Sequence, residues 1–312
     1  MSATPLSRRG LAAAALAFIW WGGLPVYLHL LAAVPGTQVV AHRIVWSCAF
    51  LLAWMLARGE LWRLTAVLAR PQHLGRLAAS ALCISVNWLL YVWSVAHQHI
   101  VDGSLGYYIN PLLNVALGVL VLRERLNRVQ WAAVVLAAAG VAYLTVLAGH
   151  PPWIALTLAF SFSLYGLLRK TVGVEALPGL ATETLLLAPL ALAYLAWSAY
   201  AGDGAFGRDG PAISALLAGC GLVTAVPLLL FAFGARALPY STVGILQYIA
   251  PSLQLVCGVM LYGERFTPAI ATGFGMIWAA LLVYAVEGVW RARAAQPAGG
   301  AGERTLRSAR RS

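Results

Sequence analysis

The chain has 312 residues, of which 61% are hydrophobic and only 10% are charged, and its mean hydropathy is +0.80. A soluble globular domain is typically about half apolar and about a quarter charged, so this composition excludes that class and predicts an integral membrane protein. The net charge of +11 comes from Lys and Arg near the ends of apolar runs and in the tail. That distribution favours contact with anionic lipid and argues against nucleic-acid binding.

Ten apolar runs are long enough to cross the hydrocarbon core, which takes about 20 helical residues. They cover residues 11–33, 38–57, 74–96, 102–122, 129–147, 152–168, 178–199, 211–235, 240–262 and 268–287. The first run is too long for a signal peptide and nine more follow it, so we expect it to be retained. The predicted fold is therefore an all-α integral membrane protein with ten transmembrane helices.

The Lys and Arg residues divide the connections between these runs into two faces. When residues 1–10 are placed inside the cell, every Lys and Arg falls in an inside segment except Arg43, Arg208 and Arg265. Cytoplasmic loops are enriched in these residues, so both termini are predicted to be cytoplasmic. The tail, residues 288–312, is polar and rich in arginine, and we predict that it is disordered.

The two halves of the chain repeat at a spacing of 140 residues. YYINPLLNVALGVLVLRER, residues 107–125, and QYIAPSLQLVCGVMLYGER, residues 247–265, share a tyrosine, a proline, a glycine and a Glu-Arg ending. The same offset superposes other spans without insertions, and five spans in each half place the second half upside down. We predict two inverted repeats, residues 11–147 and 152–287, and helix-end contacts for the Glu-Arg endings.

Pro111 and Pro251 each remove a backbone N–H in the middle of a span, where we expect a helix kink near the membrane midplane. Transporter substrates commonly bind at this depth. The candidate cavity residues are aromatic and amide side chains of these and other spans: Trp20, Trp21, Tyr27, Asn87, Trp88, Tyr91, Tyr107, Asn110, Asn114, Tyr165, Gln247, Tyr248 and Gln254. The alternative is that the amides only hydrogen-bond neighbouring helices.

Two ionisable residues, Arg43 and Glu183, lie inside predicted spans at equivalent repeat positions. A charge at this depth costs about 2.5–3.5 kcal/mol on insertion scales, so each needs a compensating role. The inversion places the two at depths that differ by about 15 Å, which argues against a mutual pair. We expect Arg43 to serve an outer gate or an anionic substrate group, and Glu183 to serve the inner side or to carry a proton. Snorkelling toward a local partner is the alternative.

Several strings together resemble the EamA group of the drug/metabolite transporter superfamily, and within it the RarD proteins. They are AHRIVWS, GYYINPL, YGLLRK and LQYIAP, and the resemblance extends over residues 11–287. It implies a bacterial inner-membrane carrier with two EamA repeats, in which spans one, three and four and their repeat partners line a cavity and spans five and ten lie at the periphery. The group's label, chloramphenicol-sensitive protein, points only weakly to a ligand, and related carriers export amino acids and other metabolites.

The predicted function is secondary transport of a small amphipathic metabolite, amino acid or drug, without a cofactor or a metal. A receptor or scaffold that retains the duplicated bundle, and an intramembrane enzyme, are the alternatives. The enzyme is disfavoured because the three aspartates lie near span ends and no G-x-S-x-G, H-E-x-x-H or phosphate loop occurs. A channel is disfavoured because no filter loop repeats. Membrane lipid is the expected environment. The sequence leaves both a monomer and a homodimer as alternatives for the assembly.

Overall fold

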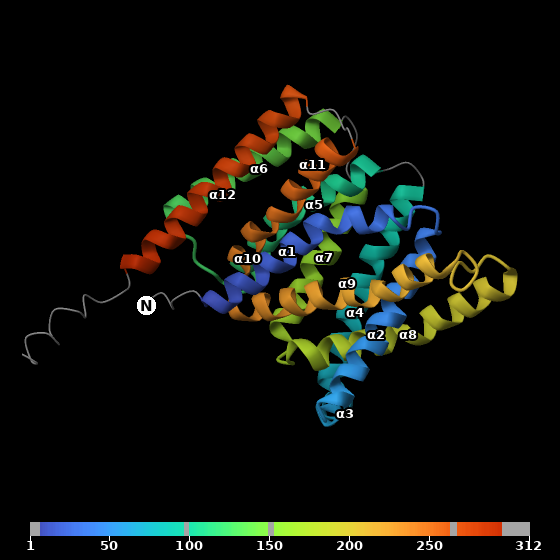
Figure 1. Cartoon of the computed structure of the whole chain (residues 1–312). Coiled ribbons are helices and arrows are strands. Elements are labelled where there is room, and N and C mark those ends of the chain that lie inside the picture. The colour runs from blue at the N-terminus through green and yellow to red at the C-terminus, as the bar shows by residue number, and fades with distance from the viewer. Residues whose placement is uncertain (1–6, 97–99, 149–152, 263–266, 295–312) are drawn as a thin grey trace, which may run out of the picture.

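The computed structural model describes residues 7–96, 100–148, 153–262 and 267–294, and every regular element in them is a helix (Figure 1). The helices are α1 (Arg8–His29), α2 (Gly36–Ala57), α3 (Leu61–Leu68), α4 (Pro71–Ala96), α5 (Ile100–Leu120), α6 (Arg128–Ala148), α7 (Trp153–Thr171), α8 (Ala176–Ala201), α9 (Pro211–Ala237), α10 (Tyr240–Gln247), α11 (Ile249–Tyr262) and α12 (Pro268–Ala294).

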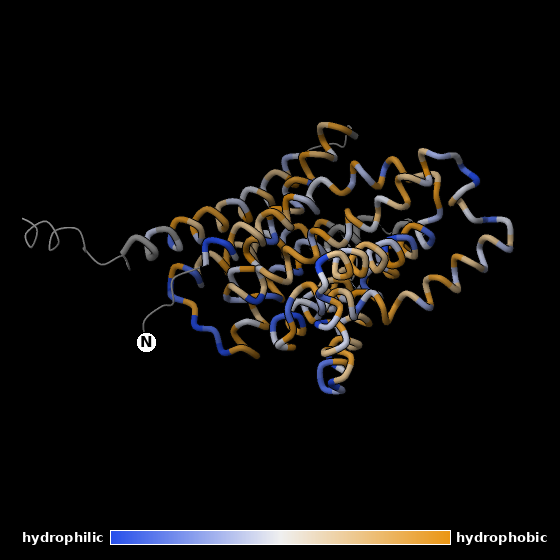
Figure 2. Tube along the Cα trace, turned by 60° about the horizontal axis from the view of Figure 1, so that its bottom comes forward, coloured by the Kyte–Doolittle hydropathy of each residue, from blue (hydrophilic) through white to orange (hydrophobic). Residues whose placement is uncertain are grey.

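Eight of the described segments are long and apolar enough to cross a membrane, with α10 and α11 counted as one. Figure 2 shows apolar residues along the helices and hydrophilic residues gathered at loops and helix ends. The prediction of an all-helical membrane protein is confirmed. Helices α5 and α7 fall on the fourth and sixth predicted spans without being among the eight, and the last turn of α7 carries Arg169 and Lys170, which lower its hydropathy. The number of ten spans stays a prediction.

One helix was not predicted, and another extends well past its predicted end. Helix α3 lies in the connection between the second and third predicted spans, with Leu64 and Val67 buried and Trp62 66% exposed. The helix has too few apolar residues to be recognised as a membrane span, although one of its faces is buried against the bundle. Helix α12 continues seven residues past 287, because nothing breaks the helix before Pro297. Residues 1–6 and 295–312, where most of the predicted termini fall, lie outside the described residues.

Helices from the two halves of the chain alternate around the centre of the bundle. Helix α1 packs on α9 and α11, and α7 packs on α4 and α5, while α2 packs on both α8 and α9. Helices α6 and α12 pack mainly on each other at the edge of the bundle (Figure 1). The centre of the bundle is therefore shared by helices of both halves, and α6 and α12 lie outside it.

The two proline-containing segments differ in the structure. Helix α5 continues through Pro111, whereas the second copy is divided into α10 and α11 at Tyr248, one turn before Pro251. Pro251 lacks the N–H that would bond the carbonyl of Gln247, just as Pro111 lacks the one for Tyr107, so a proline at this position permits a break without imposing one. Gly244 of α10 lies against α5, since a methyl group there would come within 2.6 Å of the Pro111 carbonyl oxygen. The two proline segments therefore cross in close contact at the centre of the bundle.

Candidate functional site

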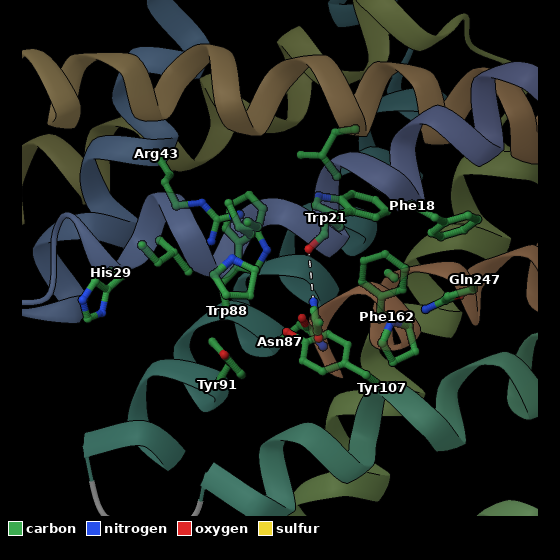
Figure 3. A pocket seen from close by; sticks show the side chains of 17 residues that line it. Phe18, Trp21, His29, Arg43, Asn87, Trp88, Tyr91, Tyr107, Phe162 and Gln247 are labelled. Carbon is green, nitrogen blue, oxygen red and sulfur yellow. Dashed lines mark hydrogen bonds between the residues drawn. The ribbon is translucent and has the colours of Figure 1, made fainter. Parts of the chain in front are cut away.

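A cavity of about 450 Å³ lies at the centre of the bundle, between helices of both halves (Figure 3). Helix α1 lines one side and α4, α5 and α7 line another, while α2, α9, α10 and α11 complete the wall. Nine residues singled out in the sequence line this cavity: Trp21, Arg43, Asn87, Trp88, Tyr91, Tyr107, Gln247, Pro251 and Gln254. The cavity is therefore built from residues separated by more than 200 positions in the chain.

Five aromatic rings close the cavity on the side toward the C-terminal ends of α7 and α9. We call them the aromatic layer: Phe18, Trp21, Phe162, Tyr165 and Phe231. Neighbouring ring centroids in the layer lie 5.4 to 6.0 Å apart, a spacing typical of tilted and edge-on aromatic contacts. Tyr165 and Phe231 are fully buried behind the rings that face the cavity. The layer therefore separates the cavity from the far end of these helices.

The cavity amides also tie helices together. Asn87 donates to the carbonyl of Leu158 at 2.8 Å and so joins α4 to α7. Gln254 of α11 donates to the carbonyl of Trp21 of α1 at 3.1 Å, the bond drawn in Figure 3. Gln247 accepts from Asn114 of α5 at 2.6 Å. The two roles considered for these amides, packing and cavity lining, therefore coincide at three positions.

The other predicted cavity residues lie outside the lining. Asn110 accepts a hydrogen bond from Ser163 of α7 at 3.2 Å, and Asn114 is wholly buried between α5 and α10. Both belong to the α5 contacts with neighbouring helices. Tyr165 lies behind the cavity in the aromatic layer.

The remaining three face other surroundings. The Tyr27 hydroxyl donates to the carbonyl of Leu216 on α9, and Tyr248 packs in a core cluster with residues of α6 and α12. Trp20 is 40% exposed on the outside of the bundle. Consecutive helical residues point about 100° apart, and here this rotation carries Trp20 to the outside while Trp21 lines the cavity.

The lining includes residues that were not predicted, Phe18, Pro25 and Leu28 of α1 among them. With Trp21 they form a stripe at helical spacing, which is the signal that would have identified them. Phe162 of α7 lies opposite this stripe and also belongs to the lining. Their apolar side chains were overlooked because the prediction followed amides and indoles.

Arg43 and Glu183 occupy separate sites. Arg43 donates from Nε to the hydroxyl of Thr224 at 2.9 Å, and its guanidinium carbon lies 4.4 Å from the centroid of the Trp88 ring. Glu183 instead faces Arg169 of α7, with 3.6 Å between charged atoms and both side chains almost completely buried. Arg169 was expected in the connection after the sixth span, on the inside, and the position in a connection is wrong: Arg169 lies buried in the last turn of α7. Its guanidinium lies against Gly179, where a methyl group would collide with one of the guanidinium nitrogens. The membrane side of this end stays a prediction.

The Glu-Arg ending of the first copy makes the helix-end contact expected for it. Glu124 accepts from the backbone N–H groups of Tyr240 and Ser241, the latter at 2.9 Å, and from the Ser241 hydroxyl at 2.7 Å. These N–H groups belong to the first turn of α10, whose positive end a carboxylate stabilises. Lys170 donates to the carbonyls of Ala235 and Leu238 at the same end of the bundle. The second Glu-Arg ending, Glu264 and Arg265, lies outside the described residues.

Among the described residues, no group of three or more His, Cys, Asp or Glu side chains is placed to hold a metal ion. The four cysteines are free, and Cys48 and Cys220 are buried. The site is therefore a cavity of aromatic, amide and basic side chains.

The comparisons with known proteins agree with this architecture. The model of the EamA-like transporter family matches residues 8–146. Protein RarD of Streptomyces exfoliatus is 43% identical over 94% of this chain and 93% of its own length. Protein RarD of Escherichia coli is 39% identical over 92% and 97%, and the uncharacterized transporter PA0485 of Pseudomonas aeruginosa is 45% identical over 93% and 97%.

A solved crystal structure of a protein that is 19% identical superposes with a TM-score of 0.69, covering 89% of this chain and 98% of its own. At that identity the likeness concerns the fold alone. The matches to curated bacterial proteins extend over nearly the whole chain, and several carry the name RarD. Together with its apolar helices, they make it a multi-pass protein of the bacterial inner membrane. The chain belongs to the EamA-like transporter family and, within it, to the RarD proteins.

Proposed function

We propose that this chain is a secondary transporter that exports or exchanges a small organic metabolite or drug by alternating access through the central cavity. The observation that carries the proposal is the cavity itself, which is large enough for a small organic molecule and is closed on one side by the aromatic layer. Because helices of both halves line it, a movement of one half against the other would change the side from which it can be reached.

The helix contacts support an inverted repeat of ten spans. With the 140-residue offset, α7 corresponds to α1, α9 to α4, and α10 with α11 to α5. The contact of α1 with α9 then corresponds to that of α7 with α4, and the contact of α1 with α11 corresponds to that of α7 with α5. Such paired contacts are what two halves related by a pseudo-twofold axis would make.

The proposed orientation places both termini in the cytoplasm. The end of the bundle that carries Glu124, Lys170 and the start of α10 is then the inner end, and its contacts hold it closed. The cavity reaches His29 at the C-terminal end of α1 and Arg43 near the N-terminal end of α2, away from the inner end of the bundle. The structure would accordingly correspond to an outward-facing state with the aromatic layer as its floor.

The competing functions lack a comparable feature in the described residues. Metal chemistry would need a ligand cluster, and none is found there. A receptor or scaffold would not require a cavity that is lined by both halves and closed by a layer of rings. The relatives are named as transporters, which also favours transport.

Filling the cavity should abolish transport. Ala250 lines the cavity, so the substitution Ala250→Trp would occupy space that a substrate needs. Cells that produce the wild-type protein should export at least one small organic solute faster than cells that produce Ala250→Trp, as measured by mass spectrometry of the medium. The control is Leu222→Trp, which adds the same ring at a position that is 46% exposed on the outer surface of α9. Identical media from cells with the wild type and with Ala250→Trp, at equal protein levels, would rule out the proposed transport.

A further inference from the structure

We infer that the cavity selects an organic monoanion, with one carboxylate on an aromatic or otherwise apolar body, and that Arg43 binds the carboxylate. The inference rests on the proposed function, because it names the class of molecule that the central cavity takes.

The guanidinium of Arg43 is held in place from two sides. Its Nε donates to the Thr224 hydroxyl of α9, and its central carbon lies over the Trp88 ring of α4, 4.4 Å from the ring centroid. The Nε bond leaves the edge with the two terminal nitrogens available, and Arg43 is one of the residues that line the cavity (Figure 3). A planar guanidinium fixed in this way is organised in advance for a carboxylate, which it binds with two parallel hydrogen bonds.

Arg43 also lacks an acidic partner. Among the side chains that the structure describes, no carboxylate lies within ion-pair distance of it, whereas Arg169, the other arginine deep in the bundle, faces Glu183 at 3.6 Å. A guanidinium inside a membrane protein is costly unless a counter-charge or a wet cavity stabilises it. A bound anion would supply the counter-charge that the described surroundings of Arg43 do not.

The rest of the wall indicates the body of the ligand. Among the described side chains that line the cavity, only His29 and Arg43 can carry a positive charge, and none is Asp or Glu. An ammonium group would therefore find no acidic partner there, and one fixed guanidinium matches a monoanion better than a dianion. Trp21, Tyr107 and Phe162 offer aromatic faces for an apolar body, and Gln247 and Gln254 offer polar atoms for one or two further hydrogen bonds.

A series of probes with the same body separates these possibilities. We would measure binding of 3-phenylpropanoate, 3-phenylpropanamide, 3-phenylpropylamine and phenylalanine to the purified full-length protein, by thermal shift and by quenching of tryptophan fluorescence. The carboxylate should bind at least about tenfold more tightly than the neutral amide, because a charge-assisted pair exceeds a neutral hydrogen bond by this much. The amine should bind more weakly than the amide.

Variants connect the selectivity to the guanidinium. Arg43→Gln should remove the preference for the carboxylate over the amide, and Arg43→Lys should retain part of it because the charge remains without the planar fork. Arg208→Gln, at an exposed arginine in the α8–α9 connection, should leave the preference unchanged. Equal or tighter binding of the amide, no binding of the carboxylate, or an unchanged preference in Arg43→Gln would overturn the inference.

Failure of the inference is distinguishable from failure of the proposed function. If the cavity takes another class of molecule, the solute difference between the wild type and Ala250→Trp persists while the carboxylate preference is absent. If the chain does not transport, that solute difference disappears whatever the probes show.

Discussion

Replacing Arg169 with methionine should destabilise the folded protein by about 3–5 kcal/mol, because it leaves the Glu183 carboxylate buried without its counter-charge. Both side chains of the pair are almost fully buried, and the two charged atoms lie 3.6 Å apart. Arg169 also donates to the carbonyl of Ala176 at 3.0 Å, which joins the end of α7 to the start of α8. The loss should be measured as a lower midpoint of thermal unfolding in detergent and a smaller yield of folded protein.

The double substitution Arg169→Met with Glu183→Leu is the matched control. Removing both charges should recover much of the lost stability, since a buried pair replaced by apolar residues of similar volume is often neutral or better. If the single substitution is as stable as the wild type, the pair does not hold these helices together. A stable double variant that still exports solute in response to a pH gradient would remove Glu183 from proton coupling and leave it a structural role.

Replacing Glu124 with alanine should loosen the proposed inner end of the bundle and cost about 3 kcal/mol, because hydrogen bonds to a carboxylate are among the stronger ones. Glu124 accepts from two N–H groups in the first turn of α10 and from the Ser241 hydroxyl. The first turn of α10 would lose these acceptors and begin to fray. Hydrogen exchange should therefore become faster at Ser241 and Thr242, with a lower unfolding temperature.

Two controls sharpen this result. Glu124→Gln keeps one oxygen acceptor and should give an intermediate exchange rate. Glu175→Ala removes a carboxylate that is 61% exposed in its pair with Arg63, and such surface pairs contribute little, so it should change neither quantity much. Exchange at the first turn of α10 that is the same in Glu124→Ala and in the wild type would show that another contact caps this helix.

The sequence predicted the elements well because their signals are local. Long apolar runs, two proline-centred copies and an arginine-rich face identify an all-helical membrane protein, and the described helices start and end close to the expected residues. Helix α3 was missed because eight residues with only one covered face do not resemble a span.

The site was harder to predict, because it depends on how each helix is rotated and on which neighbour it meets. Trp20 and Trp21 look equivalent in the sequence, yet only Trp21 faces the cavity. Arg169 looks like one of the basic residues that mark the cytoplasmic face, and only the folded arrangement shows its side chain buried beside Glu183 of α8. The role of Glu124 depends on α10, which begins 116 positions later.

Accessibility of position 254 from the two sides of the membrane tests alternating access most directly. Gln254 lines the cavity, and a single cysteine there, with the four native cysteines replaced, can be labelled with a membrane-impermeant maleimide. Trp20→Cys, on the outer surface of the bundle, is the control and should be labelled from neither side in intact membranes.

Alternating access predicts that Gln254→Cys reacts both in right-side-out and in inside-out vesicles. A reversible cross-linker between cysteines introduced at positions 124 and 241, whose side chains are in contact, should abolish labelling in inside-out vesicles only. Two results would contradict alternating access through this cavity. One is labelling of position 254 in only one of the two vesicle preparations, and the other is labelling in inside-out vesicles that persists after cross-linking.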